Sequence, residues 1–229
     1  MFFGDSTIVL LIPAILLSLY AQWKISSAYK HYSKIRSQSG LTGAQAARAL
    51  LNSNGLYDVR VEPIRGRLSD HYDPRSRVIN LSEDVYQSSS LASVAVAAHE
   101  TGHALQHASG YFPMTLRSSF VPVANIGSGA GPILILAGLF IPSFDWLLQL
   151  GIFAFAFAVL FQIITLPVEY NASHRALVLL QEGNLLGSEE IRGARSVLNA
   201  AALTYVAAAL AAVLTLARFI LISRGRSND

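Results

Sequence analysis

Four stretches of the chain are almost free of charge and apolar enough to cross a membrane as helices, which need about 20 mostly apolar residues each. The stretches are residues 8–23, 121–141, 146–166 and 200–222. Only the last one contains a charge, Arg218, near its end, where a long side chain can reach the bilayer surface. We therefore predict a mainly α-helical membrane protein with about four transmembrane helices.

The polar segment at residues 40–118 has a mixed pattern. Leu41–Leu51 has the spacing of a short amphipathic helix, and Thr42 is a suitable N-cap for it. Tyr57–Pro63 and Arg77–Leu81 alternate between apolar and polar residues as short strands do. This segment is therefore expected to contain both helix and strand.

Two further helical regions are predicted. Leu91–Ala108 is apolar and rich in alanine, which favours a buried helix. The polar segment at residues 168–199 has a helical pattern with a break near Gly183–Gly187. We expect the two polar segments to form one small α+β region, and the whole chain, residues 1–229, to form a single membrane domain.

The composition agrees with a membrane protein. Of the 229 residues, 52% are hydrophobic and only 14% are charged, against about a quarter in soluble domains. The absence of cysteine excludes disulfides, thiolate metal sites and cysteine nucleophiles. The net charge of +3 is better explained by membrane topology than by nucleic-acid binding, which we do not expect.

Lysine and arginine are concentrated in the two polar segments. Residues 24–117 contain eleven and residues 168–199 contain three, whereas the N-terminus and the short loop at residues 143–145 contain none. The positive-inside rule places the polar segments in the cytoplasm and the N-terminus outside. Four spans would also put the C-terminus outside, although it carries Arg224 and Arg226. We give more weight to the fourteen residues than to these two.

The predicted helix Leu91–Ala108 contains the pattern His-Glu-x-x-His at His99, Glu100 and His103. Residues four apart share one face of a helix, so the two imidazoles can bind one metal ion. Glu100 lies beside them and can take a proton from a metal-bound water. The pattern predicts a zinc-dependent peptidase, because burying these three side chains without a metal would be costly.

A catalytic zinc site needs a third protein ligand. His107 is about 12 Å along the helix from His99, too far to share one coordination shell, and is expected to be a supporting or surface residue. Glu169 follows the third apolar stretch and is a candidate ligand. It is equally well explained as an acidic residue at a helix N-terminus after Pro167, and the sequence pattern leaves both explanations open.

Taken together, four segments resemble the YugP-type neutral zinc metallopeptidases of bacterial membranes. They are residues 69–74, 80–82, 97–106 and 167–176, and the resemblance extends over nearly the whole chain. The overall plan is similar to that of HtpX-type gluzincins, which implies a zincin-like catalytic region between spans 1 and 2 and between spans 3 and 4. It also implies a multi-pass location in the bacterial plasma membrane.

The resemblance implies one zinc ion per chain, bound by His99, His103 and Glu169, with Glu100 as the general base. Gluzincins commonly have an aspartate four residues after the glutamate ligand, where it orients a zinc-binding histidine. Ser173 occupies that position here. The support that zinc-bound imidazoles need is therefore expected from another group or from a weaker partner.

Other site residues are predicted from the chemistry of peptide hydrolysis. The transition state carries an oxyanion, which a histidine, tyrosine or arginine usually stabilises. His71 and Arg175 are our main candidates, although residues 70–74 have the composition of a polar turn and Arg175 can pair with a carboxylate. Arg77–Leu81 is a candidate edge strand for pairing with an extended substrate.

The function predicted from the sequence is that of a zinc-dependent, membrane-bound endopeptidase. Its substrates would be proteins or peptides, membrane proteins among them, cleaved on the cytoplasmic side. One alternative is an intramembrane protease of the site-2 type, which would need a metal-binding aspartate segment that the chain lacks. Another is a non-enzymatic zinc-binding membrane scaffold, which would have no use for Glu100.

Overall fold

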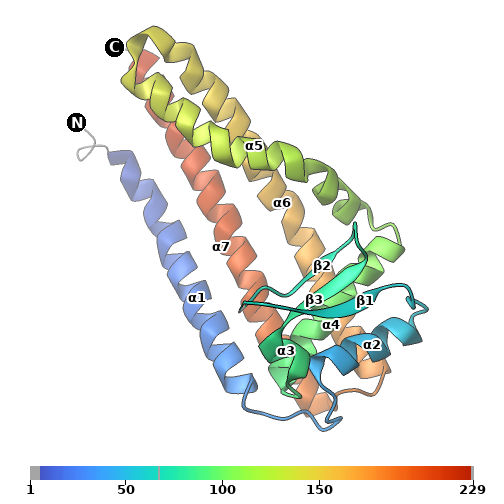
Figure 1. Cartoon of the computed structure of the whole chain (residues 1–229). Coiled ribbons are helices and arrows are strands. Elements are labelled where there is room, and N and C mark those ends of the chain that lie inside the picture. The colour runs from blue at the N-terminus through green and yellow to red at the C-terminus, as the bar shows by residue number, and fades with distance from the viewer. Residues whose placement is uncertain (1–5, 67, 228–229) are drawn as a thin grey trace. The chain divides into compact units, whose positions relative to one another are not determined.

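The computed structural model describes residues 6–66 and 68–227. This part of the chain is mainly helical and contains one three-stranded sheet (Figure 1). The N-terminus, predicted to face outside, lies beyond the described residues.

Four long helices are apolar enough to cross a membrane, which confirms the prediction of four spans. They are α1 (Ile12–Tyr32, preceded by the 3₁₀ helix η1, Ser6–Leu11), α5 (Phe112–Phe140), α6 (Asp145–Glu182) and α7 (Ser188–Ser227). A short 3₁₀ helix, η2 (Pro142–Phe144), precedes α6. Most of these helices are longer than the apolar stretches, because backbone hydrogen bonding continues after the apolar sequence has ended.

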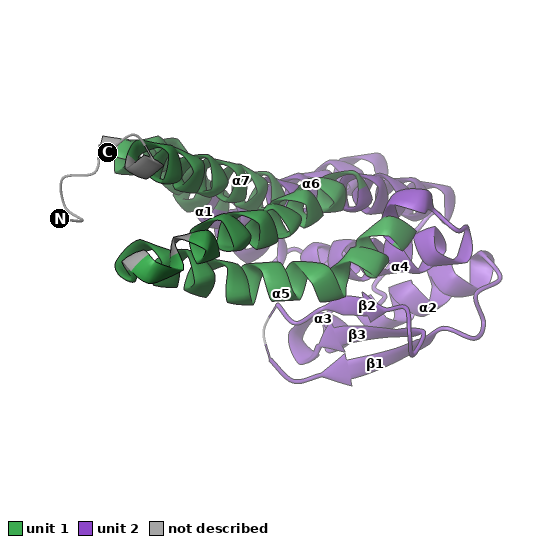
Figure 2. Cartoon of the chain, turned by 90° about the horizontal axis from the view of Figure 1, so that it is seen from above, with its two compact units in different colours: residues 1–21, 115–167, 204–229 green, residues 22–114, 168–203 purple. Residues whose placement is uncertain are grey.

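The chain forms two compact units (Figure 2). Residues 1–21, 115–167 and 204–229 form the first, and residues 22–114 and 168–203 form the second. Each unit therefore combines segments that are far apart in the sequence.

Within the first unit, α5 and α6 approach each other closely through glycines. A Cβ atom on Gly127 would lie 2.3 Å from the carbonyl oxygen of Ala154, and one on Gly138 would lie 2.4 Å from the backbone nitrogen of Leu148. Such contacts are typical of membrane helices, in which small residues let two backbones come together.

The second unit begins with the predicted amphipathic helix, α2 (Gly43–Ser53). The Thr42 hydroxyl accepts a hydrogen bond from the Gln45 amide, and the Gln45 side chain accepts one from the Thr42 amide. This reciprocal capping box satisfies two backbone donors that a helix start leaves without partners. It confirms the predicted helix and its N-cap.

The sheet contains β1 (Arg60–Ile64), β2 (His71–Asp73) and β3 (Val78–Ser82) in the order β1-β3-β2. β1 and β3 correspond to the two predicted strands and run parallel, with Val61 opposite Ile79. β2 pairs antiparallel with β3, with Tyr72 opposite Ile79. The expectation of a polar turn at residues 70–74 was wrong, because this segment contains β2.

The prediction that Arg77–Leu81 forms an edge strand is also wrong. β3 occupies these positions and is the central strand, so its backbone groups are already paired on both sides. The strands at the two edges of the sheet are β1 and β2. Any extended peptide that adds to this sheet must therefore pair with one of those two.

Helix α4 (Leu91–Ala108) has the predicted bounds and lies at the centre of the second unit, after the short helix α3 (Glu83–Gln87). Val94 and Ala98 pack in a cluster that includes side chains of α2, α6 and α7. Ala97 and Ala104 pack in a second cluster that includes apolar residues of the sheet. The motif helix is thus held between a helical layer and the sheet.

Gly102 allows α4 and α6 to come into backbone contact. A Cβ atom at this position would lie 2.5 Å from the carbonyl oxygen of Ala172. This close approach places α6 beside His99 and His103.

We predict that Gly102→Ala will destabilise the protein, because the added methyl group must push the two backbones apart. Overpacking of this kind costs about 1–3 kcal/mol, and the gain in helix propensity offsets less than about 1 kcal/mol of it. Gly129→Ala is the matched control, since nothing lies within 4 Å of the Cβ position at this helical glycine. Thermal unfolding of the detergent-solubilised variants would measure both effects, and equal midpoints would contradict the prediction.

Candidate metal centre

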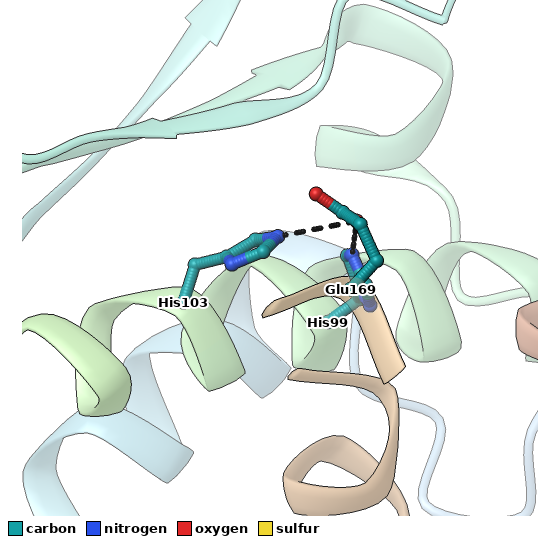
Figure 3. A group of neighbouring side chains, drawn as sticks. All are labelled: His99, His103 and Glu169. Atoms are coloured by element: carbon teal, nitrogen blue, oxygen red, sulfur yellow. Dashed lines mark hydrogen bonds and ion pairs between the residues drawn. The ribbon is translucent and has the colours of Figure 1, made fainter. Parts of the chain in front are cut away.

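Three side chains meet where α4 and α6 cross. His99 and His103 extend from consecutive turns of α4 toward Glu169 of α6 (Figure 3). One potential ligand atom from each residue lies within 4.8 Å of the other two. The structure thus brings together all three predicted zinc ligands. His99 and Glu169 are 70 residues apart along the chain.

Their spacing fits a tetrahedral ion. Oε2 of Glu169 lies 3.3 Å from Nε2 of His99 and 3.6 Å from Nε2 of His103. Ligand atoms about 2.0–2.1 Å from a tetrahedral zinc ion lie about 3.3–3.4 Å from one another. Only small adjustments would be needed for the three atoms to share one ion.

Gln106 fixes the second nitrogen of His103. Its side-chain amide donates to the Val168 carbonyl at 2.8 Å and to Oδ1 of Asn171 at 3.0 Å. The Gln106 oxygen therefore faces Nδ1 of His103 at 3.0 Å and can only accept a hydrogen bond. His103 must carry a proton on Nδ1, which leaves the lone pair of Nε2 directed at Glu169 when the ring is neutral.

Ser173 is the corresponding partner of His99. Its hydroxyl lies 3.2 Å from Nδ1 of His99, where it can accept the ring N–H. The position that carries an aspartate in gluzincins thus still contacts a histidine, through a neutral hydroxyl. Both imidazoles have the kind of support that zinc-binding histidines usually show.

Nε2 of a neutral His103 and the Glu169 carboxylate, which both accept hydrogen bonds, face each other in this arrangement. The Nε2 lone pair of a neutral His103, a ring nitrogen of His99 and a carboxylate oxygen of Glu169 converge on a buried point, and Glu169 is only 2% exposed. Such a group is costly unless a cation lies between its members. The donor set of two imidazoles and one carboxylate suits zinc, and the residues present fit one zinc ion.

Glu100 lies beside this group but outside it. Its side chain is 6% exposed, and its carboxylate accepts a hydrogen bond from the backbone amide of Tyr72 in β2. Burial raises the pKa of Glu100 to about 7, with a further increase from Glu169 and Asp70, while His99 lowers it. A carboxyl with this pKa can accept and release a proton near neutral pH, as a general base must.

His71 and Arg175 are bound to other groups. Nδ1 of His71 lies 2.7 Å from the Ser69 carbonyl, and Nε2 lies 3.2 Å from the Asn80 amide nitrogen, so both ring nitrogens have partners. Nε of Arg175 donates to Oδ1 of Asn171 at 2.8 Å. A direct role for either residue in stabilising an oxyanion remains a prediction.

His107 has an exposed side chain and does not join the metal-ligand group. Its Nδ1 lies 2.8 Å from the Tyr72 hydroxyl, and burial raises the pKa of that tyrosine. His107 is thus a surface residue that contacts β2. Its position outside the ligand group agrees with its predicted distance from His99 along the helix.

The explanation of Glu169 as a helix N-terminal residue is wrong. Pro167 lies inside α6, which begins at Asp145, so Glu169 is 24 residues from the helix start. The proline interrupted the sequence pattern without ending the helix, because an interior proline removes one backbone hydrogen bond and membrane helices tolerate it. The carboxylate of Glu169 therefore has no N-terminal amides nearby to explain its burial.

Sequence reasoning missed Gln106 and Asn171. Asn171 links Gln106 to Arg175, because its Oδ1 accepts from both side chains. The only available signal was an amide three residues after His103, on the same side of the helix. That spacing is common and does not by itself distinguish a supporting residue from a surface one.

Comparisons with known proteins agree with this centre. The family described as "Putative neutral zinc metallopeptidase" matches residues 7–224. The chain belongs to this family. It is 51% identical over 216 residues to the "Putative membrane protease YugP" of Bacillus subtilis (strain 168), covering 94% of this chain and 95% of that protein. No solved structure gives a significant match. Family membership and four apolar helices identify a membrane protein related to zinc peptidases.

We predict that Gln106→Leu will weaken zinc binding by about 10–100-fold, the usual effect of removing a residue that supports a zinc ligand. The leucine keeps most of the volume but leaves Nδ1 of His103 without its acceptor. Competition with a fluorescent chelator would measure the zinc dissociation constant. Gln181→Leu, the same change at an exposed position of α6, is the control. Equal zinc affinity in the two variants would show that Gln106 does not support the site.

Proposed function

We propose that the chain is a zinc-dependent, membrane-bound endopeptidase that hydrolyses peptide bonds of protein substrates. The observation that carries this proposal is the convergence of His99 and His103 on one oxygen of Glu169, with the buried carboxyl of Glu100 one residue from His99. A purely structural metal site needs no such carboxyl. Membership in the zinc metallopeptidase family supports the same conclusion.

Each residue has a distinct part in the proposed reaction. Zinc, when bound, supplies a Lewis acid that lowers the pKa of a coordinated water to about 7. Glu100 takes a proton from the water that attacks the peptide carbonyl and passes it to the leaving amine. Gln106 and Ser173 hold the two imidazoles in the orientation and tautomer that keep Nε2 available.

We propose that strand β2 binds the substrate backbone. It is an edge strand, and the backbone of Tyr72 is hydrogen-bonded to the Glu100 carboxyl. An extended peptide can add to such an edge through main-chain hydrogen bonds. We therefore propose that the substrate pairs with β2, which contacts Glu100, and not with Arg77–Leu81.

The site-2 alternative receives less support. The helices that are long and apolar enough to span a membrane do not include α4, which carries the motif. The third candidate ligand is Glu169, three residues beyond the apolar part of α6. A zinc-binding scaffold would use the same three ligands, but unlike a peptidase it would not need Glu100. The cytoplasmic orientation of the site is proposed from the distribution of lysine and arginine.

We predict that Glu100→Gln will reduce proteolysis by about 100-fold or more, the usual contribution of a general base, while one zinc ion per chain is retained. Cleavage of a fluorescent casein by the purified protein and metal analysis of the same sample would test this. Glu189→Gln, at an exposed position, should leave both quantities unchanged. Full activity of Glu100→Gln would exclude the mechanism, and absence of activity in the wild type would favour the scaffold.

Glu169→Ala and His99→Ala should each lose bound zinc, since two remaining ligands cannot hold the ion tightly. Metal analysis after dialysis against a weak chelator would show this loss, and Glu182→Ala, an exposed change at the end of the same helix as Glu169, is the control. Retention of a full equivalent of zinc in Glu169→Ala would remove this residue from the ligand set.

A further inference from the structure

We propose that a groove beside α1 receives the segment of a membrane-anchored substrate that directly follows its transmembrane helix. The inference rests on the proposed peptidase function and specifies its substrate class. It predicts cleavage close to the bilayer, in a chain that is still anchored in the membrane.

The groove lies entirely within the second unit and has a volume of about 420 Å³. One wall is formed by a single face of α1, including Ile25, Ser26 and Tyr29. The opposite wall includes Leu68, from the loop between β1 and β2, and Ser82 at the end of β3. The lining also includes the charged residues Lys30 and Asp84. This mixture of apolar, hydroxyl and charged groups suits a peptide better than a lipid chain, which would need an apolar lining throughout.

The groove lies at the depth where α1 leaves the hydrocarbon. The charge-free stretch of α1 ends at Trp23, and Lys24 follows it. A tryptophan followed by a lysine is typical of the boundary between bilayer and water. Ser26, which lines the groove, is three residues beyond Trp23, or about 4.5 Å along the helix axis. A substrate helix in the same bilayer would end at a similar depth.

The metal centre has the same relation to its own helix. Glu169 follows Leu166, the last residue of the charge-free stretch of α6, by three residues, which is again about 4.5 Å. The candidate ligand and the groove thus each lie within one helical turn of the end of an apolar stretch. Peptide bonds that can reach this centre include those immediately outside the hydrocarbon.

The start of strand β2 lies next to the groove. Ser82, which lines the groove, donates its amide and its hydroxyl to Asp70 at 2.8 Å and 3.0 Å. Asp70 directly precedes β2, which begins at His71. Two residues further on, the Tyr72 amide binds Glu100 directly. A chain lying in the groove is therefore next to the start of the edge strand that leads to the centre.

The length of the groove limits the position of the cut. Its α1 wall extends from Gln22 to Lys30, eight residue steps or about 12 Å. An extended peptide covers this distance with about four residues at about 3.3 Å each. We therefore expect the cleaved bond to lie within about ten residues of the end of the substrate's transmembrane helix.

The experiment uses the full-length, zinc-loaded protein reconstituted in lipid vesicles with two reporters. Both carry the same transmembrane helix and the same unfolded cleavable segment, joined directly in one and through a 30-residue Gly/Ser linker in the other. We expect the direct reporter to be cleaved at least tenfold faster. Equal rates would overturn the inference alone, and failure to cleave either reporter or soluble casein would overturn the proposed function as well.

A matched pair of variants tests the groove itself. Ser26→Trp places a large ring in the groove and should slow cleavage of the direct reporter at least tenfold. Ser27→Trp makes the same change at the next, exposed position, which does not line the groove, and should leave the rate unchanged. Zinc content measured on both variants shows whether the centre has folded. Equal rates for the two variants would overturn the inference.

A binding measurement keeps the proposal testable if Ser26→Trp does not fold. A photo-crosslinking residue is placed at position 26 or 27 in the Glu100→Gln background and irradiated with the direct reporter. We expect crosslinks at position 26 to map to the segment just after the reporter's transmembrane helix, at least tenfold more abundant than at position 27. Equal crosslinking at the two positions would show that the groove does not hold the substrate.

Discussion

The candidate metal centre depends on one constraint: two imidazole nitrogens and a carboxylate oxygen must be held close together in a buried place, although Nε2 of a neutral His103 and the carboxylate both accept hydrogen bonds. A cation removes this conflict only if each ring keeps its other nitrogen protonated, and Gln106 and Ser173 meet that requirement. The carboxylate must also arrive from another helix at backbone contact distance, which Gly102 permits. The contacts of Gln106 and Ser173 with the two imidazoles and the missing side chain of Gly102 thus serve the same interaction, the binding of one metal ion.

The position of Glu100, the proposed general base, depends on the sheet as much as on its own helix. α4 packs between a helical layer and the sheet, so Glu100 is buried against β2 and receives the Tyr72 amide. Burial alone would favour a neutral carboxylic acid, whereas the amide and a nearby cation favour the carboxylate. The balance between these effects allows one residue both to accept and to release a proton. It also couples the edge strand to the chemistry proposed for a peptide bound there.

The parts of the fold that follow from local pattern were predictable. The apolar, alanine-rich composition of Leu91–Ala108 gave the bounds of α4, and Thr42 as an N-cap gave the start of α2, because composition and capping act over a few residues. Strand β2 was missed because three residues cannot establish an alternating pattern, and the central position of β3 depends on pairing between distant segments. The environment of Glu169 required knowing that α6 continues through Pro167. The pairing of Gln106 with Val168 and Asn171 is a tertiary contact between two helices, which no spacing in the sequence reveals.

The position of the centre just beyond the apolar stretch of α6 agrees with the physical demands of the proposed peptide hydrolysis near a membrane. The reaction consumes water, which the hydrocarbon excludes, and the substrate must be extended, which the hydrocarbon forbids because unpaired amides are too costly there. A chain leaving the bilayer first meets both conditions at the interface. An edge strand placed there supplies hydrogen bonds to the amides that the substrate helix no longer pairs. A peptidase with its metal centre at this depth can therefore act on anchored chains without drawing them out of the membrane or opening a water path into it.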